Sequence, residues 1–143
     1  MRSRARIILP VAFALAAVQS HAGAATVSVD IGPTATLQLG AQAVVASVTV
    51  TCPARAPTDG IQENRLEVRQ LRRGTLVVGV GGTGNVTCDG KPHAYQITAH
   101  VQEPTHRFGT GPAEANMFVL ICSATGATCM QGDVTESLVI VAG

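Results

Sequence analysis

The amino-acid sequence predicts an all-β protein, a sandwich of two antiparallel sheets held by two disulfide bonds. Three observations lead to this prediction. Apolar residues recur at every second position over several short stretches, Gly, Pro and Asp turn signals separate these stretches, and four cysteines are spread among them. A two-residue period is typical of strands with one buried face, and an even number of cysteines favours a bridged domain.

The N-terminal segment has the order of a secretory signal peptide. Three arginines precede the apolar run Ile7–Val18, and the small residues "HAGAA" follow shortly after it. The run is twelve residues long, whereas a membrane span needs about twenty. We therefore expect a signal peptide over residues 1–24, one exported β-sandwich domain over residues 25–143, and no membrane span in that domain.

The first expected strands lie before the first cysteine. Thr26–Asp30 and Thr34–Leu39 each alternate apolar with polar residues, and we expect a turn at Gly32-Pro33 between them. Ala43–Cys52 is the clearest strand, because apolar residues alternate with serine and threonine over its second half. Two prolines and an Asp-Gly pair then predict a loop over residues 53–60.

The middle of the chain is expected to hold three further strands. Arg65–Leu71 contains residues that favour a helix, but Leu66 and Val68 fit a two-residue period and the flanking segments are β. We therefore expect a strand there. Thr75–Val80 reads as the next strand, and Asn85–Cys88 is expected to resume it after a run of glycines.

That run of glycines matches the spacing of a dinucleotide-binding loop, with Gly79, Gly81 and Gly84 in the order G-x-G-x-x-G. Such a loop must open a helix whose first turn faces the pyrophosphate. Two β-branched residues, an Asp-Gly pair and a proline follow instead, and they exclude the start of a long helix. We interpret the glycines as a flexible strand end and hairpin turn.

The last third of the domain is expected to contain three strands and a long loop. Alternation predicts a strand over His93–Val101, directly after the Asp-Gly turn. Glycines and prolines predict a loop over Gln102–Pro112. Ala113–Cys122 is apolar on both faces, as in a central strand, and Thr135–Val141 closes the domain.

All four cysteines follow the expected cleavage site, which favours two disulfide bonds in an exported chain. Four cysteines permit three pairings. We expect Cys52 to pair with Cys88 and Cys122 with Cys129, because the second pair brackets the short turn "SATGAT". A hairpin would bring the ends of this turn together.

Charge gives no support for a nucleic-acid partner. Without the three arginines of the expected signal peptide, seven basic residues face nine acidic ones, a formal net charge of −2. The locally basic segment, residues 65–73, interleaves four arginines with a glutamate and follows another at position 63. We interpret it as a solvated strand face.

Sequence motifs of catalysis and metal binding are absent. No G-x-S-x-G or H-E-x-x-H occurs, and Ser47 or Ser123 would need a histidine and an aspartate brought close by the fold. No C-x-x-C pair occurs, and His93, His100 and His106 lack zinc-finger spacing. We therefore expect neither an enzyme, nor a cofactor, nor a metal site.

The long loop carries a candidate binding site at Arg107 and Phe108, a basic residue beside an aromatic one. The pair could contact a partner, or Phe108 could tuck under the loop as its anchor. A second exposed basic residue is Lys91, in the turn "CDGKPH". A protease inhibitor would present a residue of this kind from a rigid loop near a cysteine, although Pro92 directly after Lys91 would obstruct substrate-like binding.

Two segments carry a resemblance to a known group of proteins. The runs "VGGTGNVTCDGKPHAY" and "FGTGPAEANMFV", together with the late cysteine hairpin, resemble uncharacterised small secreted proteins of high-GC Gram-positive bacteria. The resemblance covers about residue 43 to the C-terminus and implies an immunoglobulin-like sandwich and an exported location. It implies no catalytic residue. Tyr95 stands where those proteins tend to carry tryptophan.

These observations lead to one expected function and two alternatives. We expect a secreted, non-catalytic binding or structural domain; the sequence leaves its partner open, with an extracellular protein as one candidate. The first alternative is an inhibitor of an extracellular protease that presents Lys91 or Arg107. The second is a small carrier of an apolar ligand.

Overall fold

A computed structural model describes residues 26–143 as seven β-strands and one short 3₁₀ turn. The strands are β1 (Ser28–Gln38), β2 (Ala43–Thr51), β3 (Gln62–Arg72), β4 (Thr75–Gly81), β5 (Pro92–Val101), β6 (Gly111–Cys122) and β7 (Cys129–Val141). The 3₁₀ turn η1 (Leu39–Ala41) joins β1 to β2. The predicted signal peptide, residues 1–24, lies outside the described residues. In the described part of the chain, no helix has the length and hydropathy to cross a membrane.

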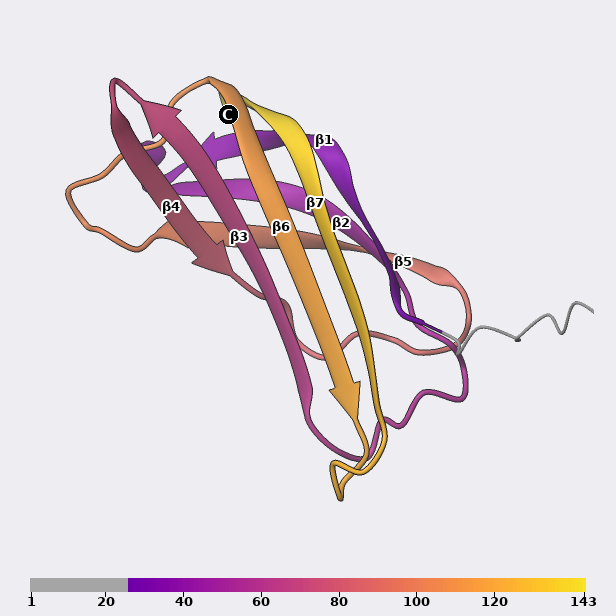
Figure 1. Cartoon of the computed structure of the whole chain (residues 1–143). Coiled ribbons are helices and arrows are strands. Elements are labelled where there is room, and N and C mark those ends of the chain that lie inside the picture. The colour runs from indigo at the N-terminus through magenta and orange to yellow at the C-terminus, as the bar shows by residue number, and fades with distance from the viewer. Residues whose placement is uncertain (1–25) are drawn as a thin grey trace, which may run out of the picture.

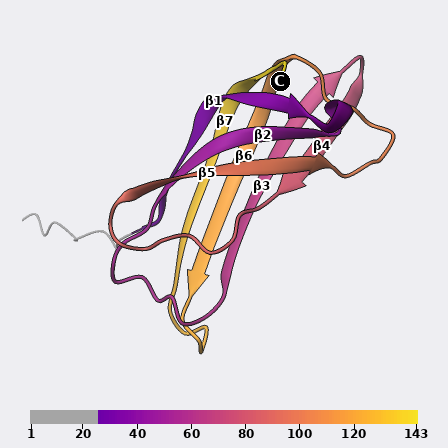
Figure 2. The same cartoon turned by 180° about the vertical axis from the view of Figure 1, so that it is seen from behind.

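The seven strands form one closed hydrogen-bonded barrel in the order β1-β2-β5-β4-β3-β6-β7. All neighbours are antiparallel except β1 and β7, which are parallel. Figure 1 shows β3, β6 and β7 crossing in front of β2 and β5, and Figure 2 shows the same two layers from behind. The sequence predicted two separate sheets, whereas pairings at both edges join the layers.

The two joining pairings are short. β1 pairs with β7 over Thr34–Thr36, and β4 pairs with β5 only through Gly79 and Val80. β1 reaches both of its neighbours because its register against β2 shifts between Ile31 and Ala35. Such a bulge bends a strand and increases its twist. The local bend of one strand therefore helps to close the barrel.

The predicted turn at Gly32-Pro33 is wrong, because both residues lie inside the single strand β1. Pro33 has no backbone N–H to donate to a ladder, which suits a bulge where pairing is interrupted. The two predicted strands on either side are therefore one strand of eleven residues.

The predicted strands Ala43–Cys52 and Arg65–Leu71 are confirmed as β2 and β3. In β2 the apolar residues Ala46, Val48 and Val50 are fully buried, and the serine and threonine residues between them are half-buried. In β3 the inward positions are Leu66 and Val68, with Gln70 after them. The two-residue period therefore predicts correctly which side chains enter the core, and Gln70 is the one polar residue among them.

The predicted strand Asn85–Cys88 is wrong, because these residues lie in the loop between β4 and β5. Side chains, rather than a neighbouring strand, accept the hydrogen bonds of their backbone N–H groups. The Val86 N–H donates to Gln62 Oε1 at 2.8 Å, and the Thr87 N–H donates to the Tyr95 hydroxyl at 2.8 Å. A β-rich composition therefore does not produce a strand where side chains accept these backbone hydrogen bonds.

Two glycines of the G-x-G-x-x-G run, Gly79 and Gly81, serve close packing at the end of β4. A Cβ at Gly81 would collide with the backbone carbonyl of Thr98 on β5, and one at Gly79 would lie 2.8 Å from the Phe108 ring. β4 ends at Gly81, and no helix follows. Glycine is needed here because a neighbouring strand and an aromatic ring occupy the space of a side chain.

Two disulfide bonds pair Cys52 with Cys88 and Cys122 with Cys129, as the sequence spacing predicts. The first joins the end of β2 to the loop before β5, across 36 residues of chain. The second joins residues that lie opposite each other in the β6–β7 hairpin. This content of disulfides is consistent with an oxidising environment.

Candidate functional site

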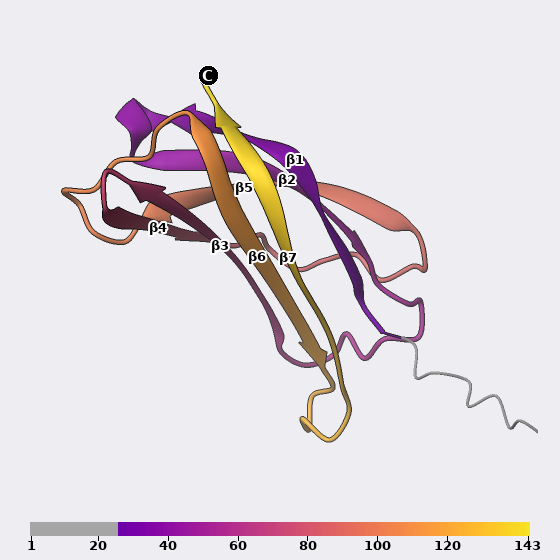
Figure 3. The same cartoon turned by 45° about the horizontal axis from the view of Figure 1, so that its top comes forward.

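Three connections lie together at one end of the barrel. They are η1, the β3–β4 turn and the loop over residues 102–110, and the three views agree on this placement (Figures 1, 2 and 3). The Phe108 N–H donates to the Ala41 carbonyl at 2.9 Å, which ties the loop to η1. The Gln102 N–H donates to the Val78 carbonyl at 2.9 Å, which ties its start to β4.

Of the two candidate binding residues, only Arg107 is exposed. The Phe108 side chain is 1% exposed and belongs to the hydrophobic core. Its ring lies against Gly79, where the missing side chain leaves room for it. Phe108 is therefore the anchor of the loop, the second of the two roles that the sequence left open.

Gln70 on β3 holds the same loop through its buried side-chain amide. Its Nε2 donates to the Gly109 carbonyl at 2.8 Å, and the Gly109 N–H donates to its Oε1 at 2.9 Å. Gln70 was not among the site residues predicted from the sequence. The alternation of β3 puts Gln70 at an inward position, and this could have indicated its role, because a buried polar side chain needs hydrogen-bond partners.

We expect Gln70→Leu to lower the free energy of unfolding by about 1–3 kcal/mol, because the N–H and carbonyl of Gly109 lose their partners in a buried site. Chemical denaturation followed by circular dichroism measures this change. The matched control is Gln96→Leu at an exposed position of β5, with an expected effect within about 0.5 kcal/mol. Equal losses for the two variants would contradict the anchoring role of Gln70.

Arginine side chains bind the outer part of the loop. Arg72 Nη1 donates to the carbonyls of Phe108 at 2.8 Å and Arg107 at 3.2 Å. Arg107 Nη1 donates to the carbonyls of Pro104 at 2.5 Å and His106 at 2.7 Å. These bonds use one nitrogen of each guanidinium and give the loop a defined shape.

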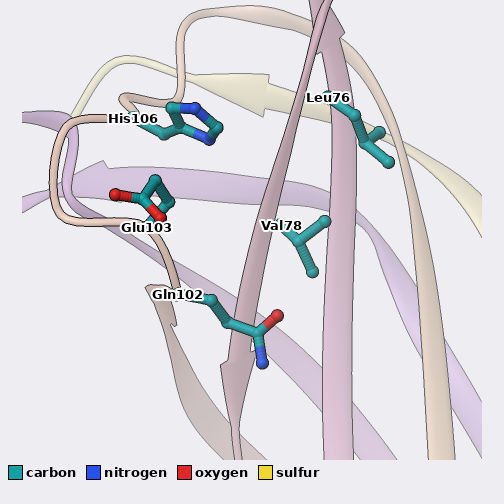
Figure 4. A pocket seen from close by; sticks show the side chains of 5 residues that line it. All are labelled: Leu76, Val78, Gln102, Glu103 and His106. Atoms are coloured by element: carbon teal, nitrogen blue, oxygen red, sulfur yellow. The ribbon is translucent and has the colours of Figure 1, made fainter.

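Two shallow hollows lie between β4 and this loop. The first, of about 270 Å³, is lined by Leu76, Val78, Gln102, Glu103 and His106. Figure 4 shows Glu103 and His106 on the loop, across this hollow from Leu76 and Val78 of β4.

The second hollow, of about 240 Å³, is lined by Arg72, Arg73, Thr75, Val77, Thr105, His106 and Arg107. We call Arg72, Arg73, His106 and Arg107 the basic rim. No carboxylate lines this hollow, although acidic residues outnumber basic ones by nine to seven over residues 26–143. Basic side chains are therefore concentrated around this hollow on a domain whose formal charge is negative.

Lys91 lies in the turn that precedes β5 and is exposed. Its backbone N–H donates to Asp89 Oδ1 at 2.9 Å, and His93 Nε2 lies 2.9 Å from the same oxygen. The Gly90 N–H donates to the Cys52 carbonyl at 2.9 Å, next to the disulfide bond. Lys91 is therefore presented from a turn with several backbone restraints.

The hydrogen bond with His93, followed by the one from the Lys91 backbone, lowers the pKa of the Asp89 carboxyl below its ordinary value. The ionised carboxylate therefore favours the folded state. This contribution is present at neutral pH and is lost as the pH falls through the lowered pKa.

The other candidate residues do not come together. Ser123 Oγ lies 3.3 Å from Thr125 Oγ1 in the β6–β7 turn, and Ser47 lies on β2 opposite Gln96 of β5. The two histidines of β5 are separated along the strand, and His106 lies in the loop. Across residues 26–143, no three His, Cys, Asp or Glu side chains are grouped as a metal ion would require.

The fold and the surface define the molecule as a small disulfide-bonded all-β barrel with one basic end. Comparison of the chain with models of known protein families, with curated proteins and with solved structures finds no match.

Proposed function

We propose that this chain is an exported, non-catalytic binding domain that contacts an acidic extracellular protein through the basic rim. The lining of the second hollow carries this proposal, because among residues 26–143 it gathers three arginines and a histidine with no carboxylate. Leu71 and Leu76 lie opposite each other on β3 and β4 and are 72% and 52% exposed. Arginine beside exposed apolar surface is typical of protein interfaces.

The way in which the loop is held supports a binding role. Phe108 and Gln70 attach it to the core, and two arginines bind its carbonyls. A loop that is ordered before binding loses less conformational entropy when a partner docks. The predicted signal peptide and the two disulfide bonds support export.

We also propose that the fold is an immunoglobulin-like sandwich, and the lengths of the strand pairings support this assignment. The pairings between β1 and β7 and between β4 and β5 extend over three and two residue pairs. The other pairings are much longer. We therefore regard the barrel as an immunoglobulin-like sandwich whose two layers are joined at both edges.

Reversing two charges of the basic rim tests the proposed function. We expect Arg73→Glu combined with Arg107→Glu to weaken binding at least about tenfold, because like charges then face an acidic partner. The measurement is capture of a partner from the culture medium of the producing organism, followed by titration of the captured protein.

The matched control reverses the same number of charges elsewhere. Arg55→Glu combined with Lys91→Glu changes two exposed residues outside the basic rim. Binding by this control is expected to stay close to that of the unmodified protein. Equal loss in both double variants, or retained binding in the rim variant, would overturn the proposed surface.

A second candidate function is inhibition of an extracellular protease through Lys91. The restrained turn beside the disulfide bond favours it, since inhibitors present a rigid exposed residue to the protease. Incubation with trypsin-like and subtilisin-like proteases tests this candidate. Stoichiometric inhibition that Lys91→Ala abolishes would support it, and no inhibition by the unmodified protein would exclude it for these classes.

A further inference from the structure

The β3–β4 hairpin determines where the backbone groups of β4 point. Its turn consists of Arg73 and Gly74, both with positive φ, of 49° and 80°. Arg72 and Thr75 flank this two-residue turn as partners, and such a closing pair exchanges both backbone hydrogen bonds. Alternation then directs the N–H and carbonyl groups of Leu76 away from β3, toward the other edge of β4.

This other edge of β4 is only partly covered. β5 pairs with β4 at Gly79 and Val80, and the Val78 carbonyl accepts the N–H of Gln102. Beyond that point the chain leaves β4 as the loop over residues 102–110 (Figure 1). In residues 26–143, the N–H and carbonyl of Leu76 therefore have no backbone partner on this edge. We call Thr75–Val78 the open edge.

The open edge is short and the loop over residues 102–110 lies beside it, but its own residues carry no protection against an added strand. Lysine, proline or a bulge on an edge strand prevents further pairing. Here the outward side chains are Leu76 and Val78, and the pairing with β3 runs without a register shift. The first hollow lies along this edge, and Figure 4 shows that the loop residues Glu103 and His106 are on its far side.

We propose that the open edge binds an extended acidic peptide segment of the partner as an additional strand. This inference rests on the proposed function and specifies the partner. The backbone of the peptide pairs with Leu76, and alternate apolar side chains of the peptide pack on Leu76 and Val78.

Charge determines where the carboxylates of the peptide lie. Arg73 and Arg107 line the hollow with Thr75 and Val77, whereas Glu103 lines the hollow with Leu76 and Val78. Successive side chains of a strand point to opposite faces, so the two hollows lie on opposite faces of β4. Acidic side chains of the peptide therefore lie on the face of Thr75 and Val77, beside the two arginines, and its apolar side chains lie on the other face.

The test uses a labelled eight-residue peptide in which valine and glutamate alternate, capped at both ends. We expect it to bind at least tenfold more tightly than the same peptide with lysine in place of glutamate. Leu76→Pro removes the N–H on the open edge and leaves the bonds to β3 in place, so we expect it to weaken binding at least tenfold. Leu76→Val keeps the N–H and shortens the side chain, so it separates the backbone hydrogen bond from side-chain packing, and we expect it to weaken binding less than Leu76→Pro does.

Two further measurements use the unmodified protein, in case Leu76→Pro does not fold. Methylation of alternate backbone nitrogens of the peptide is expected to abolish binding. In hydrogen exchange, the Leu76 amide is expected to exchange rapidly in the free protein and slowly with the peptide. The Val77 amide, which faces β3, is expected to be slow in both states.

Three results would overturn the inference. They are equal binding of the glutamate and lysine peptides, binding that survives both Leu76→Pro and backbone methylation, and a dimer of the free protein that Leu76→Pro dissociates. The third would assign the open edge to a second copy of the chain. None of these results decides the proposed function, which is tested separately by the charge reversal at Arg73 and Arg107.

Discussion

Replacing Cys52 and Cys88 together with alanine is expected to lower the free energy of unfolding by about 4 kcal/mol. The bridge closes a segment with a sequence separation of 36, and its removal returns that chain entropy to the unfolded state. The loss is a large share of the roughly 5–15 kcal/mol that stabilises an ordinary domain. Urea denaturation followed by circular dichroism measures it.

The second disulfide bond provides the matched control. Cys122 and Cys129 are separated by 7 residues, so their joint replacement with alanine is expected to cost only about 2.5 kcal/mol. The hairpin around them is also held by the continuous pairing of β6 and β7. A larger loss for this pair than for Cys52 and Cys88 would contradict the argument from loop length.

Phe108→Ala is expected to lower the free energy of unfolding by about 3–5 kcal/mol, the range for removing a buried phenylalanine ring. Phe108 is the one aromatic side chain of the described residues that is almost completely buried, and it holds the loop that carries Arg107. We therefore also expect weaker binding at the basic rim. Denaturation and partner titration measure the two effects separately.

Combining Phe108→Ala with a substitution at Gly79 tests whether the contact between these two residues accounts for the stabilisation. A Cβ at Gly79 would lie 2.8 Å from the Phe108 ring, so Gly79→Ala is expected to cost about 1–3 kcal/mol in the unmodified protein. In Phe108→Ala the cost is expected to fall, because the added methyl group enters the vacated space. Gly84→Ala, which has no atom within 4 Å of its Cβ position, is the control. Additive losses for Gly79→Ala and Phe108→Ala would contradict the packing argument.

Part of the candidate site was accessible from the sequence. The run of glycines and prolines around Arg107 and Phe108 indicated a long loop with a basic and an aromatic residue, and the structure places a loop there. The sequence left two roles open for Phe108, and burial of its ring decides between them. Arg72 and Arg73 read as part of a solvated strand face, and their place beside Arg107 was not predicted.

The sequence by itself determined the all-β class, most of the strands and the pairing of the cysteines. The class and the strands depend on the two-residue alternation of neighbouring side chains. The pairing depends on the short separation of Cys122 and Cys129, which leaves Cys52 to pair with Cys88. The ambiguous segment over residues 65–71 was assigned to a strand because the flanking segments are β, and β3 confirms the assignment.

Only the tertiary structure decided the closure of the barrel, the loop at Asn85–Cys88 and the grouping of the basic rim. Each of these depends on contacts between residues far apart in sequence. Local periodicity carries no information about which distant strand pairs with an edge, or which distant side chain accepts a backbone N–H. The physical reason is that these outcomes follow from the packing of the whole chain around one core.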